Sequence, residues 1–253
     1  MKMHALSGGR LRVRRTIYDA EAERGETMDL PVSAFLLRHP QGNVLFDSGY
    51  HPAVAEDPAA RWGGMSRVMA PIAPADDNVV DNLGRIGFGP QDIDLVICSH
   101  LHSDHCGCTS FFTKATMLCH AREIAAARAP DSGRAGYVRE DWDLPLALQE
   151  IDAEHDVFSD SRIVVIPVPG HTPGTVAARV ELDRSGAFLL ASDAVSFGDD
   201  LERGTIHRNT WSPEEAERSL ALIRRIEADG ATVICGHDEA QWAALKKGAE
   251  AYD

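Results

Sequence analysis

A dense group of metal-binding side chains occupies residues 99–107, which read Ser-His-Leu-His-Ser-Asp-His-Cys-Gly. The run Asp94–Cys98 before it is apolar and rich in β-branched residues, which predicts a buried strand. Residues two apart in an extended chain point to the same side, so His100 and His102 can reach one ion. Imidazole and carboxylate groups are donors that zinc accepts, so we predict a metal site rather than a polar loop. The candidate ligands in this stretch are His100, His102, Asp104 and His105.

Three further polar side chains stand where other predicted strands end. His171 lies in a Pro-Gly-His-Thr-Pro-Gly turn, and Asp193 and His237 each follow a short apolar run. Each of them alone is compatible with an ordinary turn, cap or loop residue. Together with the first four they make seven candidate ligands, too many for one tetrahedral zinc, so we predict two ions. The two oxygens of the Asp193 carboxylate allow it to bridge them.

The order of the predicted elements indicates strands and helices in each half of the chain, which fits a β-sandwich covered by helices. The Ser-Pro-Glu-Glu sequence at Ser212 is a strong helix start, with a Ser cap and Pro at the first helical position. No linker or low-complexity stretch interrupts the chain, so we expect a single domain over residues 1–253. Outside the metal motifs, we predict strands over Leu11–Tyr18, Pro31–Arg38 and Asn43–Asp47, and helices over Asp76–Ile86 (capped by Asp76 or Asp77), Ala121–Arg128 and Glu239–Ala251. We expect Asp131–Asp160 to be an irregular excursion with some strand character.

Composition excludes several classes of partner. The 253 residues carry a net charge of −14, which argues against a nucleic acid or an anionic membrane as partner. No apolar stretch is long enough to span a membrane, and Met1–Arg15 lacks the apolar core of a signal peptide. The odd number of five cysteines favours reduced thiols, so we expect a cytoplasmic protein.

The segment His51–Pro74 is long for a connection, and such segments are often lids or interaction surfaces. Trp62, Met65 and Met69 within it are candidates to line a substrate entrance or a homodimer contact. A surface helix with ordinary core contacts fits the same pattern equally well.

The ligand pattern, His-x-His-x-Asp-His followed by His, Asp and His at strand ends, resembles that of the metallo-β-lactamase superfamily over essentially the whole chain. The sequences Ser-His-Leu-His-Ser-Asp-His, Pro-Gly-His-Thr-Pro-Gly, Ser-Asp-Ala and Gly-His-Asp look most like the N-acyl-homoserine lactonase group. The resemblance implies an α+β fold, an αβ/βα four-layer sandwich of two similar halves with the site at one edge. It also implies a first zinc on His100, His102 and His171, a second on Asp104, His105 and His237, and Asp193 as the bridge.

The function that the resemblance implies is hydrolysis of a small lactone, an N-acyl-homoserine lactone or a related one, by hydroxide held between two zinc ions. Manganese, cobalt or iron are further options for the metal. Asp104 is then expected to pass a proton to the leaving oxygen. Glyoxalase II-like thioesterases share the ligands, so a thioesterase or another carboxylic-ester hydrolase is the alternative. A zinc-stabilised binding module is disfavoured, because structural zinc sites close at four ligands.

One residue departs from the lactonase pattern. The lactonases that the chain resembles place a Tyr three residues after the bridging Asp, where it hydrogen-bonds the substrate, and this chain has Ser196 there. A serine hydroxyl is shorter, which favours either a different lactone or a different hydrogen-bond donor. The candidate substrate-binding residues are therefore Ser196, His207 and Tyr50.

Overall fold

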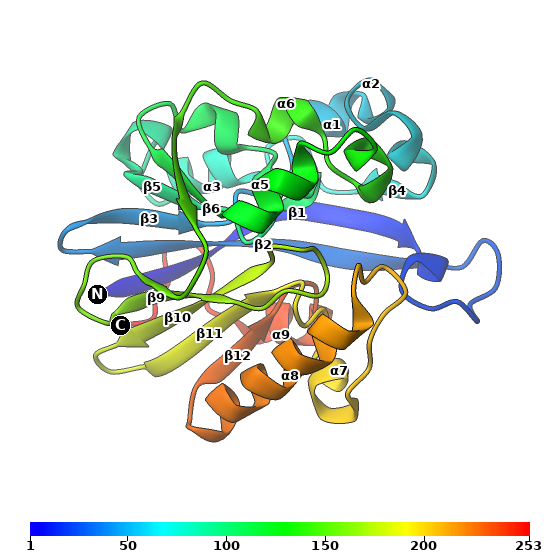
Figure 1. Ribbon diagram of the computed structural model, residues 1–253. Helices are drawn as coiled ribbons and strands as arrows, with labels where there is room; N and C mark the ends of the chain where they lie inside the picture. Colours follow the sequence, from blue (N-terminus) through cyan, green and yellow to red (C-terminus); the bar gives the residue numbers. More distant parts are fainter.

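The computed structural model describes all 253 residues, which form two β-sheets stacked face to face with helices on their outer sides (Figure 1). The first sheet has the order β4-β1-β2-β3-β5-β6-β7 and the second β12-β11-β10-β9-β8. The first is built from β1 (Lys2–Arg14), β2 (Thr27–His39), β3 (Gly42–Phe46), β4 (Met69–Pro71), β5 (Leu95–Ile97), β6 (Thr116–His120) and β7 (Ala147–Ile151). The second is built from β8 (His155–Asp156), β9 (Ile163–Pro167), β10 (Val176–Leu182), β11 (Gly186–Ser192) and β12 (Thr232–Cys235).

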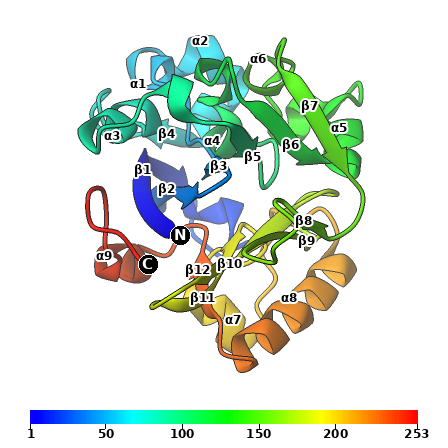
Figure 2. The same ribbon diagram turned by 90° about the vertical axis from the view of Figure 1, so that its left-hand side faces the viewer.

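Helices cover the outer face of each sheet, as Figure 2 shows. The first sheet carries α1 (Ala53–Glu56), α2 (Pro58–Trp62), α3 (Val79–Arg85), α4 (Ser103–Cys106), α5 (Ala121–Ala127) and α6 (Arg139–Trp142). The C-terminal part of the chain contributes α7 (Gly198–Arg203), α8 (Pro213–Ala228) and α9 (Glu239–Ala244). Short 3-10 turns span η1 (Arg15–Ile17), η2 (Gly63–Arg67), η3 (Pro90–Asp92), η4 (Thr109–Phe111) and η5 (Ser132–Ala135). No helix is both long enough and apolar enough to cross a membrane. The layers confirm the predicted α+β sandwich.

Strand β9 shows how the two-residue period of a strand builds these layers. Ile163 and Val165 belong to the core between the two sheets, whereas Val164 and Ile166 belong to the core beneath α7 and α8. Successive side chains of a strand point to opposite faces, so an unbroken apolar run serves two cores at once. Because β9 packs against a core on each face, its end is anchored at one edge of the sandwich.

Two predicted helix boundaries are wrong. Helix α3 begins at Val79, and its cap is Asn78, whose side chain accepts from the Asp81 nitrogen at 3.0 Å, so Asp76 and Asp77 lie outside the helix. Helix α9 ends at Ala244 and not at Ala251, because the chain beyond it pairs with β1 through Lys247 and Tyr252. Tertiary pairing here overrides a local helical pattern.

Two other predictions need correction. Strand β1 begins at Lys2 and ends before Tyr18, and a register shift between Ser7 and Arg10 interrupts its alternation. Gly9 in that shift has φ 111°, and a Cβ atom there would lie 2.3 Å from the Tyr50 ring. The predicted excursion contains β7 and β8, which confirm its expected strand character, and also the helix α6, which was not predicted.

Candidate metal centre

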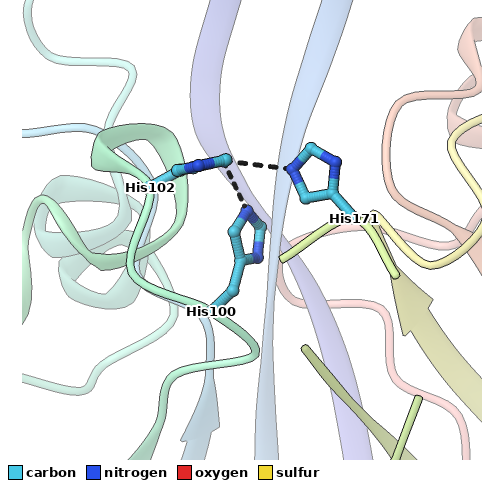
Figure 3. Close-up of side chains that lie close together, drawn as sticks. All are labelled: His100, His102 and His171. Carbon is cyan, nitrogen blue, oxygen red and sulfur yellow. Dashed lines mark hydrogen bonds between the residues drawn. The ribbon is translucent and has the colours of Figure 1, made fainter. Parts of the chain in front are cut away.

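The seven predicted ligands lie together at one edge of the sandwich, where strands of both sheets end. The first group contains His100 and His102, which follow β5, and His171, which follows β9. Nδ1 of His102 lies 3.1 Å from Nε2 of His100 and 3.0 Å from Nε2 of His171 (Figure 3). Three ring nitrogens that converge at this spacing can hold one cation.

A second group joins α4 to the end of β12. Asp104 and His105 on α4 and His237 after β12 place one ligand atom each within 4.8 Å of the others. The pairing of two consecutive residues with a distant histidine follows from the turn of α4, which carries Asp104 and His105 back toward the sheet edge.

Asp193 lies between the two groups. Its Oδ1 is 3.3 Å from Nε2 of His105 and 3.1 Å from Nε2 of His237, and its Oδ2 is 3.4 Å from Nε2 of His171. One oxygen therefore faces each group, as a bridging carboxylate requires.

Two buried polar atoms without hydrogen-bond partners indicate that this set of ligands suits bound cations. Nε2 of His105 and Oδ1 of Asp193 are buried and have no hydrogen-bond partner of acceptable geometry. Leaving such an atom unsatisfied costs about 1–3 kcal/mol. A divalent ion at this position would satisfy both atoms at once.

Electrostatics divide the histidines into two classes. Burial lowers the pKa of His171 to about 3 and that of His100 well below its ordinary value, so both rings are neutral, the form that binds metals. Burial also opposes charge on His105 and His237, but the carboxylates of Asp193 and Asp104 outweigh it and raise the pKa of both rings. The site therefore favours positive charge beside Asp193, which is the charge balance that bound cations also provide.

Hydrogen bonds fix which ring nitrogen faces the cluster. Nε2 of His102 donates to the carbonyl of Ala135 at 2.8 Å, so its Nδ1 carries the lone pair that points into the site. Nδ1 of His237 donates to the carbonyl of Pro31 at 2.9 Å, which leaves Nε2 for the site. Such outer contacts orient metal ligands and set their tautomers.

Asp47 is a supporting residue that the sequence did not reveal. Its buried carboxylate lies 2.9 Å from Nδ1 of His105 and accepts from the backbone nitrogen of Ser99 at 2.7 Å. The available signal was an Asp-Ser-Gly turn directly after a predicted strand, and Asp47 has φ 58°. Turn chemistry alone did not distinguish it from an ordinary turn aspartate.

Glu123 on α5 is a second supporting residue that the sequence did not reveal. Its side chain is fully buried and accepts from the backbone nitrogens of Leu101 and Gly174, each at 3.0 Å, and from Thr172 Oγ1 at 2.7 Å. One carboxylate therefore ties the loop that carries His100 and His102 to the loop that carries His171.

The candidate substrate-binding residues lie in different surroundings. Ser196 is buried and lines a cavity of only about 20 Å³. His207 borders that cavity, with its Nε2 2.7 Å from Oδ2 of Asp200. The Tyr50 hydroxyl accepts from the backbone nitrogen of Arg10 at 3.3 Å, and its ring is buried in an apolar cluster. The Tyr50 hydroxyl is thus engaged by the backbone of β1.

A cavity of about 360 Å³ opens directly onto the ligands. His102, Asp104, His171 and Asp193 form its polar end. Met65 and Met69 line it, as the substrate-entrance interpretation of this segment predicted, whereas Trp62 is buried and donates to Ser103 Oγ at 2.5 Å. The apolar wall is completed by Leu11, Val13, Ile17, Leu30 and Val68. The cavity therefore suits a molecule with a polar head and an apolar tail.

Known proteins are similar to this chain in both sequence and fold. A sequence model of the metallo-beta-lactamase superfamily matches residues 27–237. The N-acyl homoserine lactonase AttM of Agrobacterium fabrum is 34% identical over 259 residues, which cover 100% of this chain and 98% of the relative. AttM of Azorhizobium caulinodans is 32% identical, with 100% and 99% covered.

Solved structures have the same architecture. An N-acyl homoserine lactone hydrolase with the product N-hexanoyl-L-homoserine bound at its catalytic metal center superposes with a TM-score of 0.89 at 24% identity, covering 99% of this chain and 98% of the other. AidC, a dizinc quorum-quenching lactonase, superposes with a TM-score of 0.68 at 14% identity, covering 94% and 87%. At these identities the superpositions establish the fold.

Proposed function

The chain belongs to the metallo-beta-lactamase superfamily, and from this membership we propose that it is a metal-dependent hydrolase that opens the ring of a small lactone. The observation that carries the proposal is the convergence of seven candidate ligands, four of which form the polar end of a cavity with an apolar wall. An N-acyl homoserine lactone has a polar ring and an apolar acyl chain, which match the two ends. Relatives that match this chain over nearly their full length are N-acyl homoserine lactonases, which supports the same substrate class.

We propose that the site holds two zinc ions, with manganese, cobalt or iron as further options. His100, His102 and His171 would hold one ion, Asp104, His105 and His237 the other, and Asp193 both. When bound, the ions lower the pKa of a water molecule to about 7 and polarise the ester carbonyl.

The residues of the chain then divide the remaining work. Asp193 and Asp104 supply the negative charge that compensates the two cations. Asp104 borders the cavity and keeps 15% of its side chain exposed, whereas the Asp193 side chain keeps 5%. This difference in exposure supports Asp104 as the carboxylate that hands a proton to the leaving oxygen of the opened ring.

The surroundings in the cell follow from charge and cysteine chemistry. We propose a cytoplasmic location, supported by five free cysteines that are all buried. A net charge of −14 supports a small-molecule substrate and not a nucleic acid.

A substrate panel tests the proposal. Metal-loaded protein is offered N-acyl homoserine lactones of increasing chain length, aliphatic and aromatic lactones, a glutathione thioester, a β-lactam and a phosphodiester. We expect the highest kcat/KM for a lactone, and among the N-acyl homoserine lactones we expect it to rise with acyl length until the apolar wall is covered. A clear preference for the thioester would instead favour the glyoxalase II-like alternative. Activity on the phosphodiester alone would refute lactone hydrolysis.

A further inference from the structure

We propose that Tyr18 is a catalytic residue of this enzyme, whose hydroxyl donates a hydrogen bond to an ester oxygen of the substrate while the ring opens. The inference rests on the proposed lactone hydrolysis. In that reaction a bond forms between a water oxygen and the carbonyl carbon, and the bond from that carbon to the ring oxygen breaks. The products are a carboxylate and an alcohol, and one proton is released. Tyr18 transfers no proton; it stabilises the negative charge that develops on oxygen.

Tyr18 is the tyrosine whose hydroxyl is available to a substrate. The chain has four tyrosines. The Tyr50 hydroxyl is bonded to the backbone of β1, and the Tyr252 hydroxyl accepts from a backbone nitrogen at 2.9 Å. The Tyr137 hydroxyl is completely buried. The Tyr18 hydroxyl forms no hydrogen bond within the chain, and its side chain borders the 360 Å³ cavity.

The position of Tyr18 places this donor beside the ligands. It lines the same cavity as Asp104 and Asp193, although it comes from the connection between β1 and β2. Burial raises the pKa of Tyr18, and the charges of Asp193, Asp104 and Asp200 raise it further. A phenol is neutral near pH 7 in any case, so the group can act as a donor.

Contacts from the C-terminal half hold the Tyr18 ring in place. The ring centroid lies 5.2 Å from that of Phe197 and 5.2 Å from that of His207, which it meets edge-on at 86°. Asp200 anchors His207, and the Tyr18 carbonyl accepts from the backbone nitrogen of Arg208 at 3.2 Å. A donor that is oriented before the substrate arrives needs little rearrangement during the reaction.

Tyr18 also accounts for the departure at Ser196. Ser196 is confined to the small cavity and is not among the residues that line the larger one. Its neighbour Phe197 instead packs against the Tyr18 ring, with the two ring planes inclined at 59°. In this chain, the segment after the bridging carboxylate thus supports a tyrosine that comes from the β1–β2 connection. In the lactonases that the chain resembles, that segment carries the tyrosine itself.

The test compares Tyr18→Phe with wild type and with Tyr252→Phe as the matched control, each as the full-length, metal-loaded protein. Loss of one oxyanion donor typically lowers kcat by about 100- to 1000-fold. We expect a fall of at least about 30-fold in kcat for Tyr18→Phe, with KM changed by less than about 3-fold. Metal content and melting temperature should equal those of wild type, because the lost hydroxyl has no partner in the chain. Calorimetry should show binding of the ring-opened product weakened by about 5-fold or more.

Three results would overturn the inference. One is a kcat of Tyr18→Phe within about 2-fold of the control. Another is a loss of metal or of thermal stability in Tyr18→Phe that matches its loss of activity, because that would show a structural role. The third is a wild-type protein that opens no lactone at all, which is the distinct failure of the proposed function and removes the basis of the inference with it.

Discussion

Asp193 is the residue on which both groups of candidate ligands depend. Its Oδ1 faces His237 at 3.1 Å and its Oδ2 faces His171 at 3.4 Å, so the carboxylate approaches members of both groups. Without this carboxylate, two cations would face each other with less negative charge between them. The cost of bringing two like charges together in a buried site is large.

We therefore predict that Asp193→Ala loses at least one of the two metals per chain and lowers kcat/KM by about 100-fold or more. His102→Ala should behave in the same way, because it removes a nitrogen from the first group. His207→Ala should keep its full metal content, since its Nε2 pairs with Asp200. Metal analysis of protein purified without chelator gives the stoichiometry. Full metal content and full rate in Asp193→Ala would disprove the bridging role.

His207 gives a prediction for pH. Burial lowers its pKa, but the hydrogen bond and the charge of Asp200 outweigh burial and raise the pKa above 6.5. A raised pKa in the folded state adds stability that is fully present below about pH 6.5 and is lost as the pH rises through the folded-state value.

The comparison is between wild type and His207→Asn. We expect the difference in the free energy of unfolding to be largest near about pH 5.5 and smallest near about pH 8.5, with a change of about 1 kcal/mol between them. Denaturant titrations at the two pH values measure it. A difference that is the same at both would show that the ion pair with Asp200 contributes no pH-dependent stability.

At the scale of elements, α5 connects the two loops of the first ligand group through Glu123. Its carboxylate accepts from Leu101, between His100 and His102, and from Gly174, three residues after His171. We predict that Glu123→Gln lowers the free energy of unfolding by about 2–4 kcal/mol, because an amide cannot accept all three buried donors. Metal affinity of the three-histidine group should fall with it.

The matched control is Glu215→Gln, which removes the charge of a carboxylate that pairs with Arg122 at the surface. Such exposed pairs contribute about 0–1 kcal/mol, so this variant should be nearly as stable as wild type. Equal stabilities of the two variants would show that Glu123 does not tie the loops together.

Elements with a local signal could be predicted from the sequence, and elements set by distant contacts could not. The start of α8 was predictable because Ser212 and Glu215 lie three residues apart and form the cap directly, at 3.3 Å. The end of α9 was not predictable, because it depends on the pairing of Tyr252 with Met3, and these two residues lie at opposite ends of the chain. The role of Glu123 in holding the ligand loops could not be predicted for the same reason, since its hydrogen-bond partners are far away in sequence.

At the scale of the whole molecule, both sheets deliver strand ends to one edge, so ligands from β5, β9, β11 and β12 meet there. The candidate ligands could be predicted because histidines and aspartates at strand ends are visible in the sequence. Tyr18 could not, because its place beside Asp104 and Asp193 depends on how the β1–β2 connection folds over the opposite half. The substrate cavity likewise arises between segments that are separate in sequence.

The central claim is that this chain uses a two-metal site to hydrolyse a lactone, and acid release measures that reaction directly. Opening a lactone by water yields a carboxylic acid that ionises at neutral pH, so each turnover releases one proton. Titration at constant pH with N-hexanoyl homoserine lactone should show steady proton release by the metal-loaded protein. A chelator should abolish the release, and added zinc should restore it. Absence of proton release from this and every other lactone of the substrate panel, by protein that holds two metal ions per chain, would contradict the account. Release that a chelator leaves unchanged would contradict it as well.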